Sequence, residues 1–396
     1  MKSIIYNPYF LFALSWSIVL LCYQLNWSEI YPPMCFELTF FLFVSISISL
    51  FLAVISNKKK KFEFKRLSHP TLYYTKIIKY IKILYLLLIL EFIEAKSIPI
   101  LDFIRGNTDI KAYMNFGIPF LHVIILNCFF LLFYLSSFCY FSSNKREKQI
   151  YIKPILLCLS APILFMSRGS AMYMIFGFFL LFIMSYNKSF IKLYTILIIS
   201  LLIVLYGFGK LGDFRMQDES ENSDYICNIG KASNNFKESI IPKTYFWSYL
   251  YISSPIATLQ NTIDTKKEFS TKTSGPIHLF VNEILPMFIS KRIGLETERL
   301  NEEYRIASTL TVGSTYLGPY LAWGWKGIVI IFLYIMSLIY IMERAIPRKS
   351  IFYIPLTLVL SNLAFFSLFD NMLIYMGLCP QLIIIYFLRK KHATFN

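Results

Sequence analysis

Apolar runs of about twenty residues recur along this chain, and a helical run of that length spans the ~30 Å hydrocarbon layer of a bilayer. The first run does not resemble a cleaved signal peptide, because Asn7-Pro8 interrupts its start and no small-residue cleavage site follows it. We therefore expect an all-α polytopic integral membrane protein with about ten transmembrane helices, in a range of about 10–12. The runs cover about residues 8–25, 34–56, 77–95, 117–141, 153–167, 170–186, 193–211, 317–342, 351–369 and 372–388.

The composition supports this expectation. Hydrophobic residues make up 56% of the 396 residues and charged residues only 16%. A soluble globule must cover its surface with polar groups, so the excess of apolar side chains predicts contact with lipid. This excludes a cytosolic enzyme, a disordered chain and a disulfide-stapled secreted module. The seven cysteines show no CxxC pair and no ligand-like spacing, so they predict neither a zinc site nor a disulfide framework.

The net charge of +16 is explained by topology. With the N-terminus placed inside, 21 lysines and arginines fall on the inner side and only four in the short outer loops. Such a bias is the positive-inside pattern, and it places both termini in the cytoplasm. Nucleic-acid binding is then not needed to account for the basic charge.

A polar segment of about a hundred residues, 212–316, divides the chain. Seven predicted helices precede it in 1–211, and three follow in 317–396, which ends in a basic tail. A connection this long between membrane helices usually carries function, so we expect a long external loop with short helices. Its aromatic stretch 245–251 is compatible with a helix lying flat at the interface and equally with an ordinary packed helix.

Acidic residues and a histidine within or beside the apolar runs lie close to the outer side of the membrane, and the inner halves of the runs hold almost no acids. Each is expensive to bury in lipid and therefore suggests a function, although hydration near the headgroups is an alternative for any single one. A proton relay would need charges at several depths, so this distribution favours a site that opens on the external face. The residues are Glu37, Glu91, Glu94, His122 and Asp370.

The turn between the fifth and sixth runs contains Ser167, Arg168, Gly169 and Ser170. An arginine at the outer interface lies in a reduced dielectric and needs an anionic partner. The glycine and the two serines add backbone and hydroxyl donors beside it, as a phosphate site requires. The alternative is an interfacial arginine that reaches lipid phosphates.

A second basic cluster lies late in the external loop. Arg292 follows an apolar stretch and precedes Gly294, which favours a fixed, fork-shaped donor near the headgroups. Arg299 shares a helical face with acidic residues and fits a solvated salt-bridge face as well. Arg305 leads into a hydroxyl-rich stretch that ends at Tyr316, which suits a carbohydrate or the aromatic belt of a helix end.

Several chemistries are absent from the sequence. It holds no Walker loop, dinucleotide fingerprint, HExxH or DxD motif, so we expect no metal and no cofactor. His278 is a candidate general base, although an isolated histidine is more often plain polar surface.

The layout resembles the Wzy-type O-antigen polymerases, which join oligosaccharide repeat units and share a GT-C-like architecture with the ligases. The likeness covers most of the chain, with ten or more spans, the Ser-Arg-Gly turn at 167–169 and the long external loop. Within and after that loop it extends to 249–259, to 286–294 and to the stretch 311–327. No arginine here is followed by glycine at the Arg-x10-Gly distance given for some members.

The resemblance implies a glycosyltransferase of the bacterial inner membrane with its active site facing the periplasm. Its substrates would be undecaprenyl-pyrophosphate-linked oligosaccharides, both as donor and as acceptor, in lipopolysaccharide biosynthesis. Essential arginines carry over to Arg168 and, less directly, to Arg292, Arg299 or Arg305. Arginines can neutralise the departing pyrophosphate, so a divalent metal need not be invoked.

The acceptor hydroxyl requires a general base, for which His278, Asp213, Glu94 and Asp370 are candidates. Membrane lipids, a chain-length regulator and the flippase of the same pathway are expected partners. An O-antigen ligase would share donor and architecture and is the alternative enzyme. A lipid-linked-oligosaccharide flippase predicts two related halves, which we do not find, and a non-catalytic scaffold would use the loop as an interaction surface.

Overall fold

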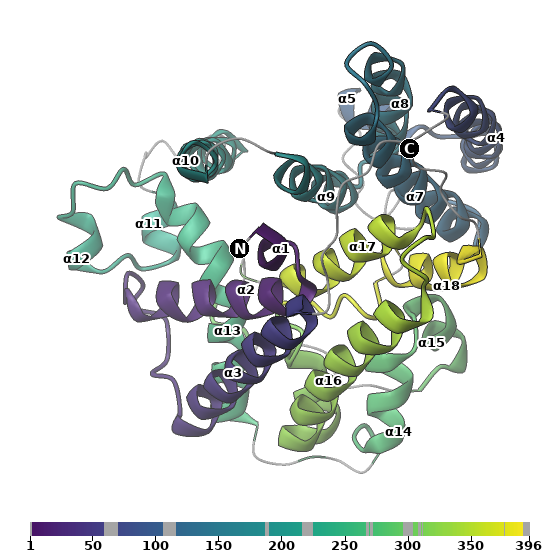
Figure 1. The fold of residues 1–396 in the computed structure, drawn as a ribbon. Coiled ribbons are helices and arrows are strands. Elements are labelled where there is room, and N and C mark those ends of the chain that lie inside the picture. The colour runs from purple at the N-terminus through teal and green to yellow at the C-terminus, as the bar shows by residue number, and fades with distance from the viewer. Residues whose placement is uncertain are drawn as a thin grey trace.

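A computed structural model gives the arrangement of the chain (Figure 1). Every named secondary-structure element in the described part is helical. The structure describes residues 2–58, 70–105, 116–186, 190–215, 225–266, 269, 272–295, 304–307, 310, 312–375 and 377–390.

A helix overlaps each of the ten predicted apolar runs. These helices are α2 (Pro8–Gln24), α3 (Phe36–Lys58), α4 (Pro70–Ala95), α7 (Leu121–Ser142), α8 (Ile152–Leu164), α9 (Arg168–Ser185), α10 (Phe190–Arg215), α16 (Leu317–Ala345), α17 (Tyr353–Phe366) and α18 (Cys379–Leu388).

Among the described residues, four helical segments are long and apolar enough to cross a membrane: Phe36–Asn57, Leu121–Ser142, Ile191–Asp213 and Leu317–Ala345. Only 6% of the most apolar stretch of the α10 segment is buried inside the protein, so lipid must surround this segment. An apolar surface of that extent is not stable in water. The chain is therefore a helical membrane protein.

The remaining elements are short, except for α13. They are α1 (Lys2–Ile5), α5 (Pro99–Ile104), η1 (Lys148–Tyr151), α11 (Tyr225–Ile229), α12 (Asn234–Lys237), α13 (Tyr245–Thr265), α14 (Pro276–Leu279), the π-helix η3 (Phe280–Ile284) and α15 (Met287–Ile293). The predicted aromatic stretch opens α13, and its side chains Phe246, Trp247 and Tyr249 are buried. This burial favours the packed-helix interpretation of that stretch over an interfacial helix.

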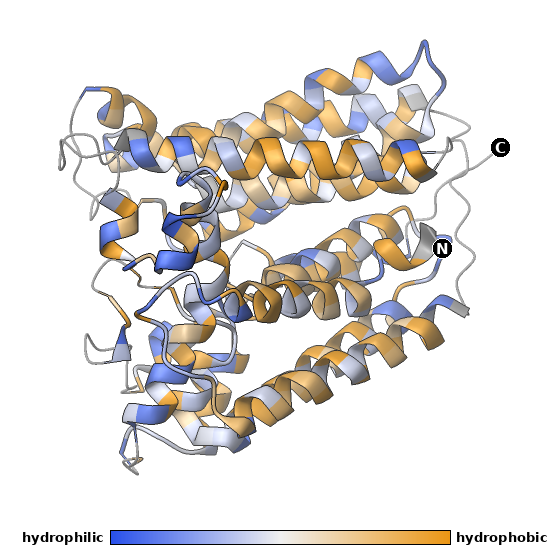
Figure 2. Cartoon of the chain, turned by 90° about the vertical axis from the view of Figure 1, so that its left-hand side faces the viewer, coloured by the Kyte–Doolittle hydropathy of each residue, from blue (hydrophilic) through white to orange (hydrophobic). Residues whose placement is uncertain are grey.

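The long helices run side by side, and the start of α1 and the end of α18 lie at the same end of the molecule (Figure 2). We call this the terminal end. At the opposite end, the loop end, lie the α8–α9 turn, the connection between α17 and α18 and the short helices α11, α12, α14 and α15. Segments that are far apart in sequence therefore converge at the loop end.

Helix α7 holds the most buried of these four segments, with 72% of its most apolar stretch inside the protein. The hydroxyl of Tyr134 on α7 donates to the carbonyl of Tyr173 on α9 at 3.1 Å, and the amide of Asn362 on α17 donates to the same hydroxyl at 3.1 Å. A Cβ added at Gly177 on α9 would lie 2.4 Å from the Tyr134 ring. These contacts fix α9, and with it the α8–α9 turn, against α7.

Helix α16 is bent near its start. Trp323 and Gly324 leave helical geometry, and Gly324 adopts φ +58°, which favours glycine. A Cβ at Gly327 would lie 2.0 Å from the carbonyl oxygen of Pro319, so the two parts of the helix meet closely there. The glycines of the Gly324-Trp325-Lys326-Gly327 stretch therefore serve this bend.

Candidate functional site

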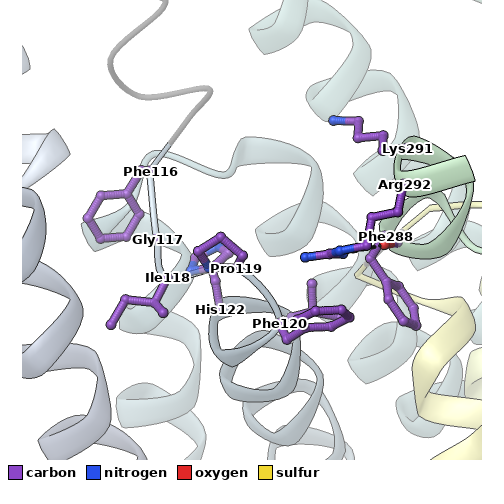
Figure 3. A pocket seen from close by; sticks show the side chains of 10 residues that line it. Phe116, Gly117, Ile118, Pro119, Phe120, His122, Phe288, Lys291 and Arg292 are labelled. Carbon is purple, nitrogen blue, oxygen red and sulfur yellow. Dashed lines mark hydrogen bonds between the residues drawn. The ribbon is translucent and has the colours of Figure 1, made fainter. Parts of the chain in front are cut away.

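A cavity of about 380 Å³ opens at the loop end, between the start of α7 and α15 (Figure 3). Its described lining contains three basic side chains, His122, Lys291 and Arg292, and no carboxylate. The rest of the lining is aromatic, aliphatic or backbone: Phe116, Gly117, Ile118, Pro119, Phe120, Val123 and Phe288. A cavity of this kind suits an anion attached to an apolar or sugar group.

The loop before α7 is turned tightly over His122. Gly117 adopts φ +101°, and a Cβ at this position would lie 2.6 Å from Cγ of His122. Only glycine fits this combination of backbone conformation and close approach. Phe120, the residue that caps α7, also takes a left-handed conformation with φ 66°. Strained backbone of this kind tends to occur at functional sites.

His122 is paired with a buried carboxylate. Its Nδ1 lies 3.0 Å from Oε2 of Glu91 on α4, and Glu91 is fully buried. The other carboxylate oxygen accepts the backbone N–H of Ile118 at 3.2 Å. A buried carboxylate is costly unless it is paired and hydrogen-bonded, and both conditions are met here.

Two aromatic rings hold the imidazole from the sides. Phe116 meets it edge-on, with ring centroids 5.5 Å apart, and Phe165 does so at 5.0 Å. Phe165 closes α8 and stands immediately before the α8–α9 turn, where Met166 adopts φ 60°. Phe165, which stands two residues before Ser167 of the turn that the sequence singled out, therefore packs against His122.

Arg292 and Lys291 come from the last turn of α15, on the opposite wall (Figure 3). The Arg292 guanidinium carbon lies 3.8 Å from the centroid of the Phe120 ring, and its Nη1 donates to the carbonyl of Phe288 at 2.7 Å. Both cations remain exposed. Stacking on an aromatic ring orients the guanidinium and leaves its other N–H groups for a ligand.

The serines of the α8–α9 turn bond to each other. Oγ of Ser167 donates to Oγ of Ser170 at 2.7 Å, and Ser170 is fully buried, 3.4 Å from the hydroxyl of Tyr375. A Cβ at Gly169 would make only ordinary contacts with Tyr173. Arg168 begins α9, but its side chain lies outside the described residues.

The connection 367–378 joins this region to the η3 π-helix. The amide of Asn371 donates to the Glu283 backbone carbonyl at 2.9 Å and to its Oε2 at 2.8 Å, while the N–H of Met287 donates to the carbonyl of Ile374 at 3.1 Å. Burial raises the pKa of Glu283 to about 8; the Asn371 hydrogen bond opposes the shift and the charge of Asp370 adds to it. Desolvation likewise raises the pKa of Asp370.

Other predicted site residues lie apart from the described lining of the cavity. Asp213 accepts from Nε1 of Trp247 at 2.8 Å and so joins α10 to α13. Tyr316 is fully buried between Trp16 and Phe41, with ring centroids 4.8 and 5.1 Å away, which is the position of a core residue. Glu94 is exposed on α4.

The basic candidates after α15 are only partly described. Arg299 lies outside the described residues. Arg305, which follows the buried Tyr304 in the chain, is half-buried. His278 on α14 is half-buried too, and its Nδ1 has no hydrogen-bond partner among the described residues. Of the predicted arginines, the structure therefore shows Arg292 at the cavity wall.

The sequence analysis does not assign Lys291 to the site. It includes Glu91 and His122 in the set of outer-end residues that favours an external site, but it gives neither a role and does not pair them. Two consecutive runs form a hairpin, so their outer ends are neighbours, and the tight Gly117 turn between them was the available signal. Within the described residues, no three His, Cys, Asp or Glu side chains gather as metal ligands would.

Comparisons with protein-family models, with curated proteins and with solved structures find no significant match to this chain. The functional argument therefore depends on the site itself.

Proposed function

We propose that this protein is a polyprenyl-pyrophosphate-dependent glycosyltransferase that polymerises lipid-linked O-antigen repeat units. In this proposal ten helices cross the bacterial inner membrane, the terminal end is cytoplasmic and the loop end faces the periplasm. The donor glycan passes from its pyrophosphate carrier to the non-reducing end of a second lipid-linked repeat unit.

The observation that carries the proposal is the position of Arg292 and Lys291 on the wall of a cavity lined by aromatic rings. A glycosyl pyrophosphate combines the two matching parts, a multiply charged leaving group and sugars with apolar faces. Charge-assisted hydrogen bonds from a guanidinium are short and bidentate, and they suit phosphate oxygens. The lining contributes no described carboxylate that would repel such an anion.

In the reaction, the bond between the anomeric carbon and the pyrophosphate oxygen breaks, and a bond from that carbon to the acceptor oxygen forms. Negative charge increases on the departing pyrophosphate as this happens. Fixed donors aimed at developing charge typically contribute about 10²–10³-fold in rate per donor. Arg292, held by Phe120 and by the Phe288 carbonyl, is such a fixed donor.

The orientation is supported by where the basic residues lie. Arg344 lies in the last turn of α16, toward the terminal end. Arg348 and Lys349 follow α16, and Arg389 and Lys390 follow α18. Under the positive-inside rule this end belongs in the cytoplasm. The cavity would then face the compartment in which lipid-linked repeat units are polymerised.

The test is a gel of surface polysaccharide from cells in which Arg292→Ala replaces the wild-type protein. The proposal expects lipid A-core that bears a single repeat unit, because polymerisation stops while flipping and ligation continue. A ligase defect would instead leave lipid A-core bare while long lipid-linked polymer accumulates. A flippase defect would remove polymer both from lipid A-core and from the lipid carrier. Normal ladders from an inserted Arg292→Ala protein would contradict the assignment.

A further inference from the structure

The proposed binding of pyrophosphate by Arg292 and Lys291 does not involve the Glu91–His122 pair. The pair nevertheless places a titratable imidazole in the wall of the cavity, with a fully buried carboxylate behind it. An imidazole backed by a carboxylate is the arrangement with which enzymes accept a proton from a hydroxyl near neutral pH.

We propose that Nε2 of His122 accepts the proton of the acceptor sugar hydroxyl, and that Glu91 positions the imidazole for this step. The inference rests on the proposed function, since it names the proton acceptor for that transfer. Oε2 of Glu91 lies 3.0 Å from Nδ1, so the N–H is held on Nδ1 and the lone pair on Nε2.

The surroundings of His122 prevent the ring from turning. Gly117 lies over Cγ, Phe116 and Phe165 flank the ring, and the backbone N–H of Ile118 holds the second oxygen of Glu91. A side chain held in one orientation by its neighbours needs no rearrangement at the moment of proton transfer.

Three carboxyl groups outside the cavity lining are less suitable as the proton acceptor. Asp213 is engaged by the indole of Trp247. The pKa of Glu283 is raised to about 8, so near neutral pH this carboxyl holds its proton instead of accepting one. Desolvation raises the pKa of Asp370 as well.

The step balances without a further reactant. The acceptor oxygen forms its bond to the anomeric carbon as the carbon–oxygen bond to pyrophosphate breaks. The hydroxyl proton passes to Nε2, and the imidazolium that forms is stabilised by the adjacent Glu91 carboxylate. The pyrophosphate leaves with its electron pair beside Arg292 and Lys291, and His122 later returns the proton to water.

The charged groups described around His122 come from two elements. Glu91 belongs to α4, and Lys291 and Arg292 belong to α15.

The experiment uses the full-length protein in nanodiscs. The probe is undecaprenyl-pyrophosphate-linked repeat units, extracted from producing cells that lack this protein. Retention of the lipid-linked donor and the rate of polymer formation are measured between pH 5 and pH 9. The variants are His122→Gln, His122→Ala and Glu91→Gln.

The inference expects His122→Gln to retain donor binding and to lose about 10²–10⁴-fold in rate, the usual contribution of general-base catalysis. Wild-type rate should fall at acid pH, where the imidazole is protonated, and this acidic limb should be missing from the residual rate of His122→Gln. Added imidazole should partly restore His122→Ala, which it would not do if His122 only supported the fold. Glu91→Gln should keep the acidic limb and lower the plateau.

Three results would overturn the inference. A His122→Gln enzyme within threefold of wild type excludes the proton role, and so does an acidic limb that persists in that variant. Loss of donor binding in His122→Gln, without rescue of His122→Ala by imidazole, assigns His122 to binding or structure. A wild-type protein that neither binds nor polymerises the probe instead rejects the polymerase proposal itself, and the proton role with it.

Discussion

The guanidinium carbon of Arg292 lies 3.8 Å above the centre of the Phe120 ring, while its Nη1 donates to the carbonyl of Phe288 four residues earlier. The same arrangement recurs at the terminal end. There the Arg389 guanidinium carbon lies 3.8 Å from the Tyr386 ring, and its Nη1 donates to the Tyr386 carbonyl at 2.8 Å. The two arginines differ in that Arg292 lines the cavity.

This recurrence supplies a matched pair of variants. Arg292→Ala should reduce polymer formation by about 10²–10³-fold, because it removes a fixed donor to the departing pyrophosphate. Arg389→Ala removes an equivalent stacked arginine far from the cavity and should stay within about twofold. The rate of polymer formation in nanodiscs measures both. Equal losses in the two variants would mean that the effect concerns membrane anchoring instead of the reaction.

A second prediction concerns Gly117. Gly117→Ala should destabilise the protein by about 1–3 kcal/mol, because φ +101° is strained for alanine and the new Cβ would displace His122. Thermal unfolding in detergent measures the loss, and the rate of polymer formation should fall with it. Gly275→Ala separates backbone strain from the clash with His122, since Gly275 has φ +138° but open space around it. Gly207→Ala, a helical position with nothing within 4 Å, should be neutral.

A clash at His122 predicts that Gly117→Ala loses more activity than Gly275→Ala for the same loss of stability. If the two variants lose the same activity for a given fall in melting temperature, Gly117 is not needed to keep His122 in position.

Much of the helix pattern could be predicted from the sequence, because lipid selects for apolar length directly. The last run shows where that signal misleads. Residues 372–388 read as one apolar stretch, but helix α18 begins only at Cys379. The preceding residues form a turn in which Asn371 bonds to Glu283, and Pro380 stands at the start of the helix. Hydropathy does not detect a turn made of apolar residues.

The site was less predictable than the helices. Arg292 was found because an arginine beside an apolar stretch and a glycine is informative by itself. The pairing of Glu91 with His122 depends on how α4 and α7 meet, and nothing local in either helix encodes it. Tyr316 shows the converse, because a tyrosine in a hydroxyl-rich stretch looks like a sugar contact but is fully buried in the core.

The raised pKa of Glu283 predicts how stability depends on pH. The carboxyl titrates near 8 in the folded protein and near its ordinary value of 4.5 when unfolded, so between these values the folded state binds more protons. Stability therefore falls as pH rises from about 4.5 to about 8. Above that range the stabilisation provided by the protonated carboxyl is lost. Glu283→Gln stays neutral throughout and should flatten this part of the curve.

Melting temperatures of wild type and Glu283→Gln across pH 5 to 9 measure the difference. Glu94→Gln, at an exposed position on α4, is the control and should leave the slope of the wild type unchanged. A slope that survives in Glu283→Gln would show that another group holds the extra proton.

The proposed orientation predicts which side of the inner membrane each end of the protein faces. Lys237 is exposed at the end of α12 at the loop end, and Lys349 is exposed between α16 and α17. In a variant without native cysteines, Lys237→Cys should react with a membrane-impermeant maleimide in cells whose outer membrane has been opened. Lys349→Cys should react only after the inner membrane is permeabilised as well. The reverse pattern would place the cavity in the cytoplasm, where polyprenyl-linked repeat units are built and not polymerised, and the proposed function would fail on topology alone.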